Sequence, residues 1–531
     1  MKAKKSTIVV LLLISIFLII SCGKNDGNDN DDGDVGDSGS TGTEAIAVWA
    51  FPDGVSIPYR DDNNDIVAGD SSIGVAAYHS TGIDQVAFTV NGLTTHVTTE
   101  TVNPETNEYE YVLTLDPSTL PADGEYTITA VAHPNNGTAT TLPNLIIQKD
   151  TASHNVLYVG GGGFATIDDA CQAAEGGDII KVRAGTYALP DQTGYNFEKY
   201  VTIMPDGSDV VEITSGSLRS SYIKFKDVTF NLTSSVTDSI ISHQETHFWF
   251  DGCTAIGFDK DAANNNAAAL RFYTASDYIV VEDSTFYDMS IGVQVLAGNS
   301  IVRNNHIYDL TADGIGYDGN NIFISNNLIH DNHLPVGGDQ HCTFLACNTG
   351  AAMVVIRNNT MYNGDHQGIK FGAGLPVRKD FFNIAVVNNL IALGADGTVN
   401  IRFENTSRDI HFDNVLVEHN TVWDGTSMFI IESDPDANNM VVRNNIFGPK
   451  SVDDMSMFSQ FDIDYNCYSS GTATGPNSVT GDPQFANSGN WNFVLNGSSP
   501  AKNRGNYFAN IKYDINWNPR NLTNPSMGAY E

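Results

Sequence analysis

The stretch Asn304-Asn-His-Ile307 returns as Asn326-Asn-Leu-Ile329, Asn358-Asn-Thr-Met361 and Asn388-Asn-Leu-Ile391. Related segments begin at Asp227, Asp251, Asp283, His419 and Asn444, and successive segments lie 21 to 32 residues apart. The shorter steps match one turn of a parallel β-helix, and the longer ones leave room for loops at one corner. Asn residues stacked at a corner can bond along the axis, so a ladder of Asn side chains is predicted.

Both ends of this repetitive region carry capping signals. The segment Ala165–Ala174, between Tyr158-Val159 and Ile179–Tyr187, reads as strand, short amphipathic helix, turn and strand. It resembles the N-terminal cap of right-handed parallel β-helices of the pectate-lyase-like superfamily. The end, Ser526-Met-Gly-Ala-Tyr-Glu531, resembles the closing segment of secreted β-helix proteins. The resemblance implies a right-handed parallel β-helix over residues 155–531, a fold that hosts several chemistries.

The first residues are predicted to be a targeting signal rather than part of a folded domain. A basic start at Lys2, Lys4 and Lys5 precedes an apolar run too short to span a bilayer comfortably. The run ends in Ile19-Ile-Ser-Cys22, which resembles a bacterial lipobox. The resemblance implies a signal peptide over 1–21, lipidation of the Cys22 thiol and an outer-membrane anchor. A plain secretory signal or an N-terminal membrane anchor is the alternative.

Two segments separate the anchor from the solenoid. Residues 22–44 are rich in Gly, Asn and Asp, and read as a solvated tether. An acidic run there resembles surface-export signals of Bacteroidetes-type lipoproteins, which implies that the protein faces the cell surface. Residues 45–150 show short alternating strands between turns such as Asn91-Gly92, which predicts a small β-sandwich similar to immunoglobulin-like domains. The sandwich is either a spacer or a carbohydrate-binding module. The fold class is therefore all-β.

Composition limits the function classes. The chain has 531 residues, with 63 acidic and 27 basic residues and a net charge of −36, and this argues against a nucleic-acid partner. The cysteines beyond Cys22 are irregularly spaced, which fits neither a disulfide framework nor a CxxC metal site. Cys342 and Cys347 could form a bridge, but buried free thiols are favoured. A monomer is expected.

Function must come from side chains that point outward from consecutive coils. Strand side chains alternate, so placing Ile369 and Phe371 inside puts Lys370 outside. The same reasoning places Asn400, Arg402 and Glu404 outside. Thr343 is also expected to point outward. The predicted outward column consists of Asp318, Asp339, His341, Lys370, Arg402, Glu404 and Glu432, with Asp365 and His366 at its border.

A stacked Lys and Arg beside carboxylates suit β-elimination from a uronic-acid polysaccharide. That reaction needs a base for the C5 proton, a cation for the substrate carboxylate and a donor for the leaving oxygen. Lys370 is the predicted base and His341 its competitor, while Arg402 would either bind the carboxylate or act on the leaving oxygen. The carboxylates of Asp339, Asp365 and Glu404 could bind Ca²⁺. The layout is similar to β-helix polysaccharide lyases with Lys/Arg/Ca²⁺ sites, although the Lys-x-Glu pattern of alginate-lyase-like members is absent at Lys370.

Other functions fit the same residues. A glycoside hydrolase would use Glu404 with Asp339 or Glu432 as its carboxylate pair. A non-catalytic glycan-binding lipoprotein would use outward aromatic residues, in which this face is poor. An epimerase would share the base with a lyase. Lys370 and Arg402 could also be ordinary exposed charges of the solenoid, which contribute little to stability. In each enzymatic reading the partner is a polysaccharide, anionic in the case of the lyase.

Overall fold

A computed structural model describes residues 43–190, 195, 197–234, 239–260, 267–334, 342–372, 379–394, 397–403, 410–431, 436–449, 451–452, 461–508 and 511–531. Strands dominate the described part, and its one α-helix is α1 (Ile167–Ala173). The described residues also include two short 3₁₀ turns, η1 (Pro117–Thr119) and η3 (Ser488–Asn490). No helix among the described residues is long and apolar enough to cross a membrane.

The N-terminal module is a β-sandwich of two sheets. The first sheet consists of β1 (Ile46–Trp49), β3 (Ser71–Tyr78), β7 (Tyr109–Leu115) and β6 (Thr101–Val102). The second consists of β2 (Val55–Ile57), β10 (Leu145–Lys149), β8 (Gly124–Pro134), β4 (Ile83–Val90), β5 (Leu93–Val97) and β9 (Thr140–Thr141). Pairing is antiparallel except between β2 and β10. Alternating apolar residues from both sheets, among them Val75, Phe88 and Ile128, form one core.

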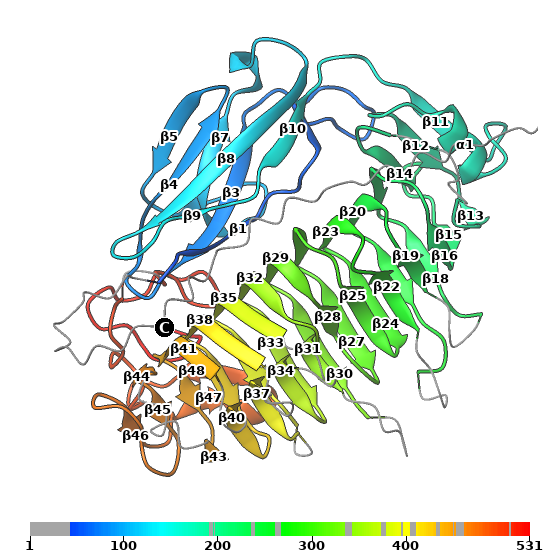
Figure 1. Cartoon of the computed structure of the whole chain (residues 1–531). Coiled ribbons are helices and arrows are strands. Elements are labelled where there is room, and N and C mark those ends of the chain that lie inside the picture. Colours follow the sequence, from blue (N-terminus) through cyan, green and yellow to red (C-terminus); the bar gives the residue numbers. More distant parts are fainter. Residues whose placement is uncertain are drawn as a thin grey trace, which may run out of the picture. The chain divides into compact units, whose positions relative to one another are not determined.

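Three long parallel sheets form the second module, a right-handed parallel β-helix (Figure 1). Sheet 1 consists of β11 (Val156–Val159), β12 (Ile179–Val182), β14 (Val201–Pro205), β17 (Ile223–Lys226), β20 (Thr246–Asp251), β23 (Asp277–Glu282), β26 (Ser300–Arg303), β29 (Gly319–Ser325), β32 (Ala351–Arg357), β35 (Lys379–Val387), β38 (Ile410–Glu418), β41 (Asp436–Arg443) and β44 (Asp462–Asp464).

Sheet 2 consists of β13 (Gly185–Tyr187), β15 (Val211–Thr214), β18 (Thr229–Asn231), β21 (Thr254–Ile256), β24 (Thr285–Met289), β27 (His306–Leu310), β30 (Leu328–Asn332), β33 (Thr360–Gly364), β36 (Leu390–Ala392), β39 (Thr421–Trp423), β42 (Ile446–Phe447), β45 (Cys467–Tyr468) and β46 (Val479–Thr480). Sheet 3 consists of β16 (Gly216–Leu218), β19 (Ile240–Ser242), β22 (Ala268–Phe272), β25 (Ile291–Val295), β28 (Ile315–Tyr317), β31 (Thr343–Cys347), β34 (Gln367–Phe371), β37 (Val399–Phe403), β40 (Ser427–Ile431) and β43 (Ser451–Val452).

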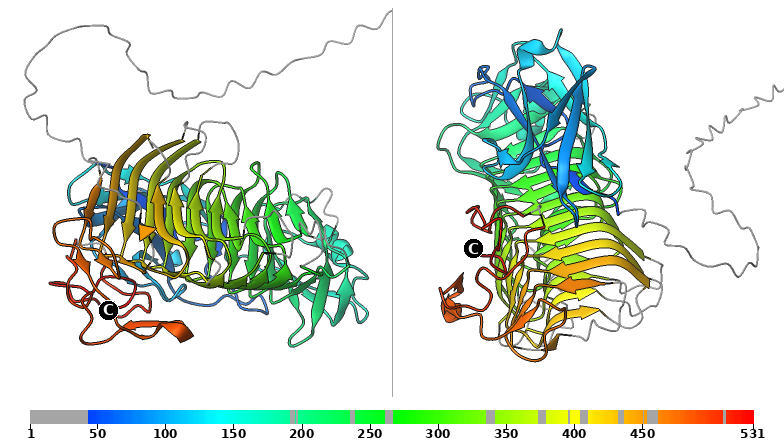
Figure 2. Two further views of the ribbon diagram at one scale, coloured as in Figure 1. Left: turned by 90° about the horizontal axis from the view of Figure 1, so that it is seen from below. Right: turned by 90° about the vertical axis from the view of Figure 1, so that its left-hand side faces the viewer.

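From β14 to β43 each coil contributes one strand to each sheet, in the order sheet 1, sheet 2, sheet 3. Figure 2 shows these strands stacked along the axis of the solenoid. The interior is a continuous column of apolar side chains from Val159 to Tyr468. Helix α1 covers the first coil with Ile167, Ala170 and Cys171, which confirms the predicted cap. An uncovered first coil would expose this apolar interior to water. The five described cysteines are buried and free, as favoured from the sequence.

The recurring polar pairs form the corner between sheets 1 and 2. Except at Asp251, where Gly252 takes this conformation instead, the first residue of each pair has a left-handed backbone, with φ of 57° at both Asn304 and Asn388. Asn and Asp tolerate this conformation better than other residues. The second residue points inward. The inward residues are Asn305, Asn327, Asn359, Asn389, Asn420, Asn445 and Asn466. Each Nδ2 donates to the next Oδ1 at 2.9–3.1 Å, which confirms the predicted ladder.

Replacing Asn389 by alanine is expected to lower the free energy of unfolding by about 2–3 kcal/mol, because buried groups on three coils lose partners. Asn389 Nδ2 donates to the backbone carbonyls of Ile356 and Val387, and its Oδ1 accepts from Asn359. Urea unfolding measures the change. The exposed control Asn496→Ala should change the value by less than about 0.5 kcal/mol. Equal effects of the two variants would contradict a stabilising ladder.

The sandwich packs against the outer face of sheet 1. Ile46 and Val48 of β1 share an apolar cluster with Phe323, Val355 and Ala385 of sheet 1. The two modules thus belong to one compact unit that begins at residue 42.

A buried ion pair joins the same two modules. Arg357 of β32 donates from Nε and Nη2 to Glu108 Oε2, at 3.2 Å and 2.7 Å, and both side chains are at most 1 % exposed. The outer face of sheet 1 in this region is therefore not available to a ligand.

The C-terminal segment closes the corner between sheets 1 and 2. The outward Asn of successive pairs donate to its backbone: Asn358 to Ile515 O at 3.1 Å, Asn388 to Tyr513 O at 2.9 Å, and Asn444 to Asn506 O at 2.9 Å. The hairpin of β47 (Phe485–Asn487) and β48 (Asn492–Leu495) packs beside it on sheet 2 through Phe493. With sheets 1 and 2 covered in these coils, sheet 3 is left as the candidate functional face.

Candidate functional site

Lys370 and Arg402 lie side by side on neighbouring strands of sheet 3. Lys370 of β34 is in register with Arg402 of β37, and adjacent strands are about 4.8 Å apart. Ile369 and Phe371 on either side of Lys370 belong to the interior column, so Lys370 points outward. Lys370 is 8 % exposed and Arg402 is half-buried. The sequence prediction that these two cations are neighbours is confirmed.

The residues preceding Lys370 in the column differ from the prediction. The residue of β31 beside Lys370 is Ala346, and the next position is Gly316 of β28. Thr343 was expected to point outward, but it is buried at the start of β31 (Thr343–Cys347), where it is in register with Gln367. The strand begins later than the apolar pattern suggested, which shifts every side chain relative to its neighbour.

Asn400 also departs from the prediction. It was expected to point outward, but it is fully buried, and its Nδ2 donates to the backbone carbonyl of Asp424 at 2.5 Å. The reason is a corner where sheet 3 begins. Phe344 and Asn400 occupy this corner, and each is followed by a second buried residue, Leu345 or Ile401. Two successive inward residues interrupt the alternation on which the prediction rested.

Several predicted residues lie outside the described part of the chain. They are Cys22, Asp339, His341, Glu404 and Glu432. Their roles remain predictions.

Asp313 is a site residue that the sequence reasoning missed. It lies just before β28, where the amide of the following Gly314 donates to Thr343 O on the next coil. Burial raises the pKa of Asp313 to about 7, while the positive charge of Lys370 and hydrogen bonds from Thr343 lower it. Oδ1 of Asp313 is buried and has no hydrogen-bond partner among the described residues.

Counting inward and outward positions back from Ile315 would have placed Asp313 inside. Gly314 occupies the corner, where an added Cβ would lie 2.8 Å from Cγ2 of Ile329 in the interior. The corner therefore reverses the direction of the preceding side chain. The sequence signal that could have identified Asp313 as a site residue is its position directly before a glycine at a corner.

A chain of partly buried hydrogen bonds holds Lys370 from one side. Its Nζ donates to Asn348 Oδ1 at 3.3 Å. The backbone amides of Asn348 and Thr349 donate to Asp318 Oδ1 at 2.8 Å and 2.7 Å. Burial raises the pKa of Asp318, and these amide hydrogen bonds oppose the rise. Asp318 is 3 % exposed, so it acts as a support for the Asn348 loop rather than as part of the outward column.

Asp365 lies at the turn between β33 and β34, where the sequence placed it at the border of the site. Its Oδ1 pairs with His333 Nδ1 at 3.0 Å, and its Oδ2 accepts the amide of Leu334 at 3.1 Å. Both oxygens are engaged, so Asp365 does not fit as a Ca²⁺ ligand without losing these contacts. The neighbouring His366 is half-buried, and its carbonyl accepts the amides of Thr398 and Val399.

We expect Asp313 to make stability depend on pH. Its pKa is about 7 in the folded chain against an ordinary value of 3.8, so the folded state binds more protons between these values. The stabilising contribution is complete below about pH 4 and is lost as the pH rises through about 7. The Asn side chain of Asp313→Asn cannot ionise, so only the natural chain should lose stability in this way. The free energy of unfolding of the variant minus that of the natural chain should therefore be larger at pH 8 than at pH 5, by about 1 kcal/mol or more. Unfolding in urea at both pH values tests this, with the exposed Asp70→Asn as control; equal differences at the two pH values would exclude the raised pKa.

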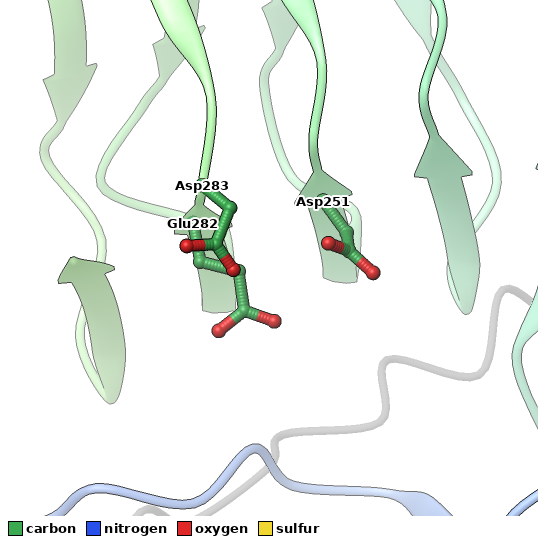
Figure 3. Close-up of side chains that lie close together, drawn as sticks. All are labelled: Asp251, Glu282 and Asp283. Atoms are coloured by element: carbon green, nitrogen blue, oxygen red, sulfur yellow. The ribbon is translucent and has the colours of Figure 1, made fainter. Parts of the chain in front are cut away.

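A second acidic group lies on sheet 1. Asp251, Glu282 and Asp283 bring their carboxylates within 4.8 Å of one another, as Figure 3 shows. Cations already neutralise two of them: Lys224 pairs with Asp251 at 2.8 Å, and Arg303 pairs with Glu282 at 2.6 Å. This group is thus accounted for by ion pairs of the protein itself.

Comparison with known proteins agrees with the fold. The chain matches a family model described as "Right handed beta helix region" over residues 219–391 and again over 272–452. The search of curated proteins returned no match. A pectate lyase, Pel9A, is similar in structure at 15% identity, covering 72% of this chain and 97% of its own, with a TM-score of 0.43. XylC in complex with xylose (10% identity, 71% and 98% coverage, TM-score 0.45) and the family 28 exopolygalacturonase of Yersinia enterocolitica (11%, 83% and 99%, 0.34) are also similar.

Proposed function

We propose that this chain is a polysaccharide lyase that cleaves a uronic-acid glycan by β-elimination. One observation carries the proposal: Lys370 and Arg402 are in register on neighbouring strands, and Lys370 influences a carboxyl group, Asp313, whose pKa is about 7. The reaction needs a base, a cation for the substrate carboxylate and a proton donor for the leaving oxygen. The three side chains match these three requirements.

In the proposed reaction Lys370 reacts as the neutral amine, and its Nζ accepts the proton from C5 of the uronate. The electron pair of that C–H bond forms the C4–C5 double bond, the C4–O4 bond breaks, and the leaving oxygen takes the proton of Asp313. Arg402 binds the substrate carboxylate through two parallel N–H···O bonds and stabilises the negative charge that develops beside it. Asn348 holds Lys370 Nζ in position.

A glycoside hydrolase is the second candidate, and Asp313 is the observation that favours it. A carboxyl group with a pKa of about 7 is suited to protonate a glycosidic oxygen near neutral pH. The partner carboxylates predicted from the sequence, Asp339, Glu404 and Glu432, lie outside the described residues. In this reaction Lys370 would not carry the chemistry.

One assay separates these functions. The mature chain, with Cys22 replaced, is incubated with a panel of uronate polysaccharides, with Ca²⁺ or with a chelator, and the ultraviolet absorbance of unsaturated uronate is followed. A lyase raises the absorbance, and the chelator decides whether the predicted Ca²⁺ takes part. Release of reducing ends without absorbance identifies the hydrolase. If no glycan gives either signal, both enzymatic proposals are overturned.

We also propose that the chain is attached to the outer membrane through lipid on Cys22 and faces the cell surface. The support is the apolar run that ends at Cys22 and the acidic stretch after it. Cys22→Ala is expected to move the chain from the membrane fraction to the soluble fraction of cells, with loss of label from radioactive palmitate. A variant that stays in the membrane fraction would favour an uncleaved N-terminal anchor.

A further inference from the structure

Two histidines meet on the outer face of sheet 2, a different face from the one that carries Lys370. His306 begins β27, and His330 lies in the adjacent strand β30. Their Nε2 atoms are 2.8 Å apart. His306 is half-buried, and the side chains of His330 and of the following Asp331 are 14 % and 39 % exposed, so solvent reaches the pair. The reaction proposed for sheet 3 uses neither histidine.

Asp331 fixes the ring of His330. The backbone of Asp331 is left-handed, with φ of 56°, and this interrupts the alternation of the strand, so His330 and Asp331 both point outward. Asp331 Oδ2 lies 2.7 Å from His330 Nδ1, and Asn363 Nδ2 donates to Asp331 Oδ1. Burial acts to raise the pKa of Asp331, but the hydrogen bonds from Asn363 and His330 outweigh it and hold the pKa below its ordinary value. The ionised carboxylate can only accept, so His330 Nδ1 carries the proton and Nε2 presents a lone pair to His306.

Aromatic rings also hold His330 in place. It lies between Tyr308 and Tyr362, with centroid distances of 5.4 Å and 4.9 Å and interplanar angles of 11° and 3°. His306 is held less firmly: its ring stacks on Tyr308, with centroids 4.6 Å apart and planes 31° apart. Burial and the charge of His330 lower the pKa of His306, so its imidazole is neutral at pH 7. A neutral imidazole whose far nitrogen is bonded to a carboxylate is the arrangement that metal-binding histidines commonly adopt.

The distance between the two nitrogens favours one kind of ion. They share a hydrogen bond, which an ion would replace, and His306 would then carry its proton on Nδ1. Imidazole binds such ions at about 2.0–2.1 Å, so an ion bonded to both nitrogens at their present separation would see them about 85–90° apart. That angle suits square-planar or tetragonal Cu²⁺ and Ni²⁺, whereas tetrahedral Zn²⁺ would need the nitrogens about 3.3 Å apart. The ring centroids are 5.0 Å apart, so the rings face each other nearly end to end and His306 has to turn to admit the ion.

We propose that His306 and His330 form a binding site for a divalent transition-metal ion, with Cu²⁺ preferred to Ni²⁺. The two Nε2 atoms are the protein ligands, water fills the other positions, and Asp331 positions His330. Copper is preferred because imidazole sites bind Cu²⁺ more tightly than the neighbouring divalent ions. The Ca²⁺ predicted for sheet 3 takes oxygen ligands and does not suit two imidazoles. The site is therefore independent of the reaction proposed for sheet 3.

Calorimetric titration of the whole mature chain, with Cys22 replaced, with CuSO₄ tests the site. The natural chain should bind one more Cu²⁺ than the double variant His306→Gln with His330→Gln, which gives the background of all other histidines. Pulsed EPR of that ion should show two imidazoles. His306→Gln alone should weaken binding at least about tenfold, and Asp331→Asn by about 10- to 100-fold. Asp309→Asn is the matched control, because Asp309 is the equivalent residue of the previous coil, with φ of 57°, and it should leave the affinity unchanged.

Any of four results overturns the proposal. Equal copper binding by the natural chain and the double variant would mean that the histidines form only a hydrogen bond and that copper binds adventitiously elsewhere. A single imidazole in the EPR spectrum would remove one of the two ligands. Tighter binding of Zn²⁺ than of Cu²⁺ would refute the geometric argument, and unchanged affinity in Asp331→Asn would refute the positioning of His330.

Two further variants keep these results interpretable. His306→Gln leaves the stacked ring of His330 in place, so it decides the question even if the double variant fails to fold. Lys370→Ala should bind copper normally, so failure of the lyase proposal leaves this result intact.

Discussion

Lys370→Ala is expected to lower kcat on the uronate polysaccharide by about 10³–10⁴-fold, with KM changed less than about threefold. A positioned general base contributes about 10²–10⁴ to the rate, and neither of the two described neighbours of Lys370 in the column is assigned that role. Ala346 lies on one side of Lys370, and on the other side is Arg402, which the proposal assigns to the substrate carboxylate. The measurement is the initial rate of ultraviolet absorbance with the purified variant. Its unfolding midpoint is measured alongside.

The same column supplies the matched control. Arg271 is an outward cation of sheet 3 four strands before Lys370, reached through Gln294, Gly316 and Ala346. At about 4.8 Å per strand it lies about 19 Å from the proposed base, so Arg271→Ala should keep kcat within about twofold. More than a tenth of the natural rate in Lys370→Ala would show that Lys370 is not the base. If Asp313→Asn were then the inactive variant, the hydrolase would be favoured.

The comparison of Lys370 with Asp313 shows what a sequence can predict about such a site. Lys370 lies between two interior residues in the middle of a regular strand, where alternation is reliable. Asp313 lies beside a corner, where Gly314 and its stacked neighbours turn inward and the alternation restarts. The corners themselves follow from backbone geometry that only the assembled coils define. The Asn ladder could be predicted at its corner because one residue type repeats there.

Strand register sets a similar limit. The apolar pattern before Phe344 suggested a strand that ends there, but β31 continues to Cys347, and Ala346 takes the place beside Lys370. Leu345 and Cys347 carry an equally good apolar pattern, so the sequence alone allowed two phases for this coil. Pairing with the coils before and after chooses between them.

The docked sandwich could not be predicted because the residues that hold it lie far apart in the chain. Glu108 and Arg357 are each unremarkable in sequence, yet they meet in a buried ion pair between the modules. Glu110 also lies 3.7 Å from Arg357 Nη2. A polar contact between two such distant residues leaves no periodic pattern in the sequence from which it could be predicted. The apolar strands of each module do leave such a pattern.

Arg357→Met is expected to lower the free energy of unfolding by about 3–5 kcal/mol at pH 8. Methionine fills much of the same space, but Glu108, which is 0 % exposed, would lose both hydrogen bonds from the guanidinium and remain as an unpaired buried charge. Urea unfolding followed by tryptophan fluorescence measures the change. The exposed pair of Arg183 and Asp206 provides the control, and Arg183→Met should cost less than about 1 kcal/mol.

The pH dependence of the Arg357→Met effect identifies its cause. Burial raises the pKa of Glu100 and of Glu110 to about 7, and the charge of Arg357 lowers both values. Because the folded-state pKa is above the ordinary 4.5, the stabilising contribution of these groups is complete below about pH 4.5 and is lost as the pH rises through about 7. Without Arg357 the carboxylates are costlier to ionise, so the variant should lose more stability between pH 5 and pH 8 than the natural chain does. An equal loss at both pH values would mean that Arg357 acts through its packing rather than through its charge.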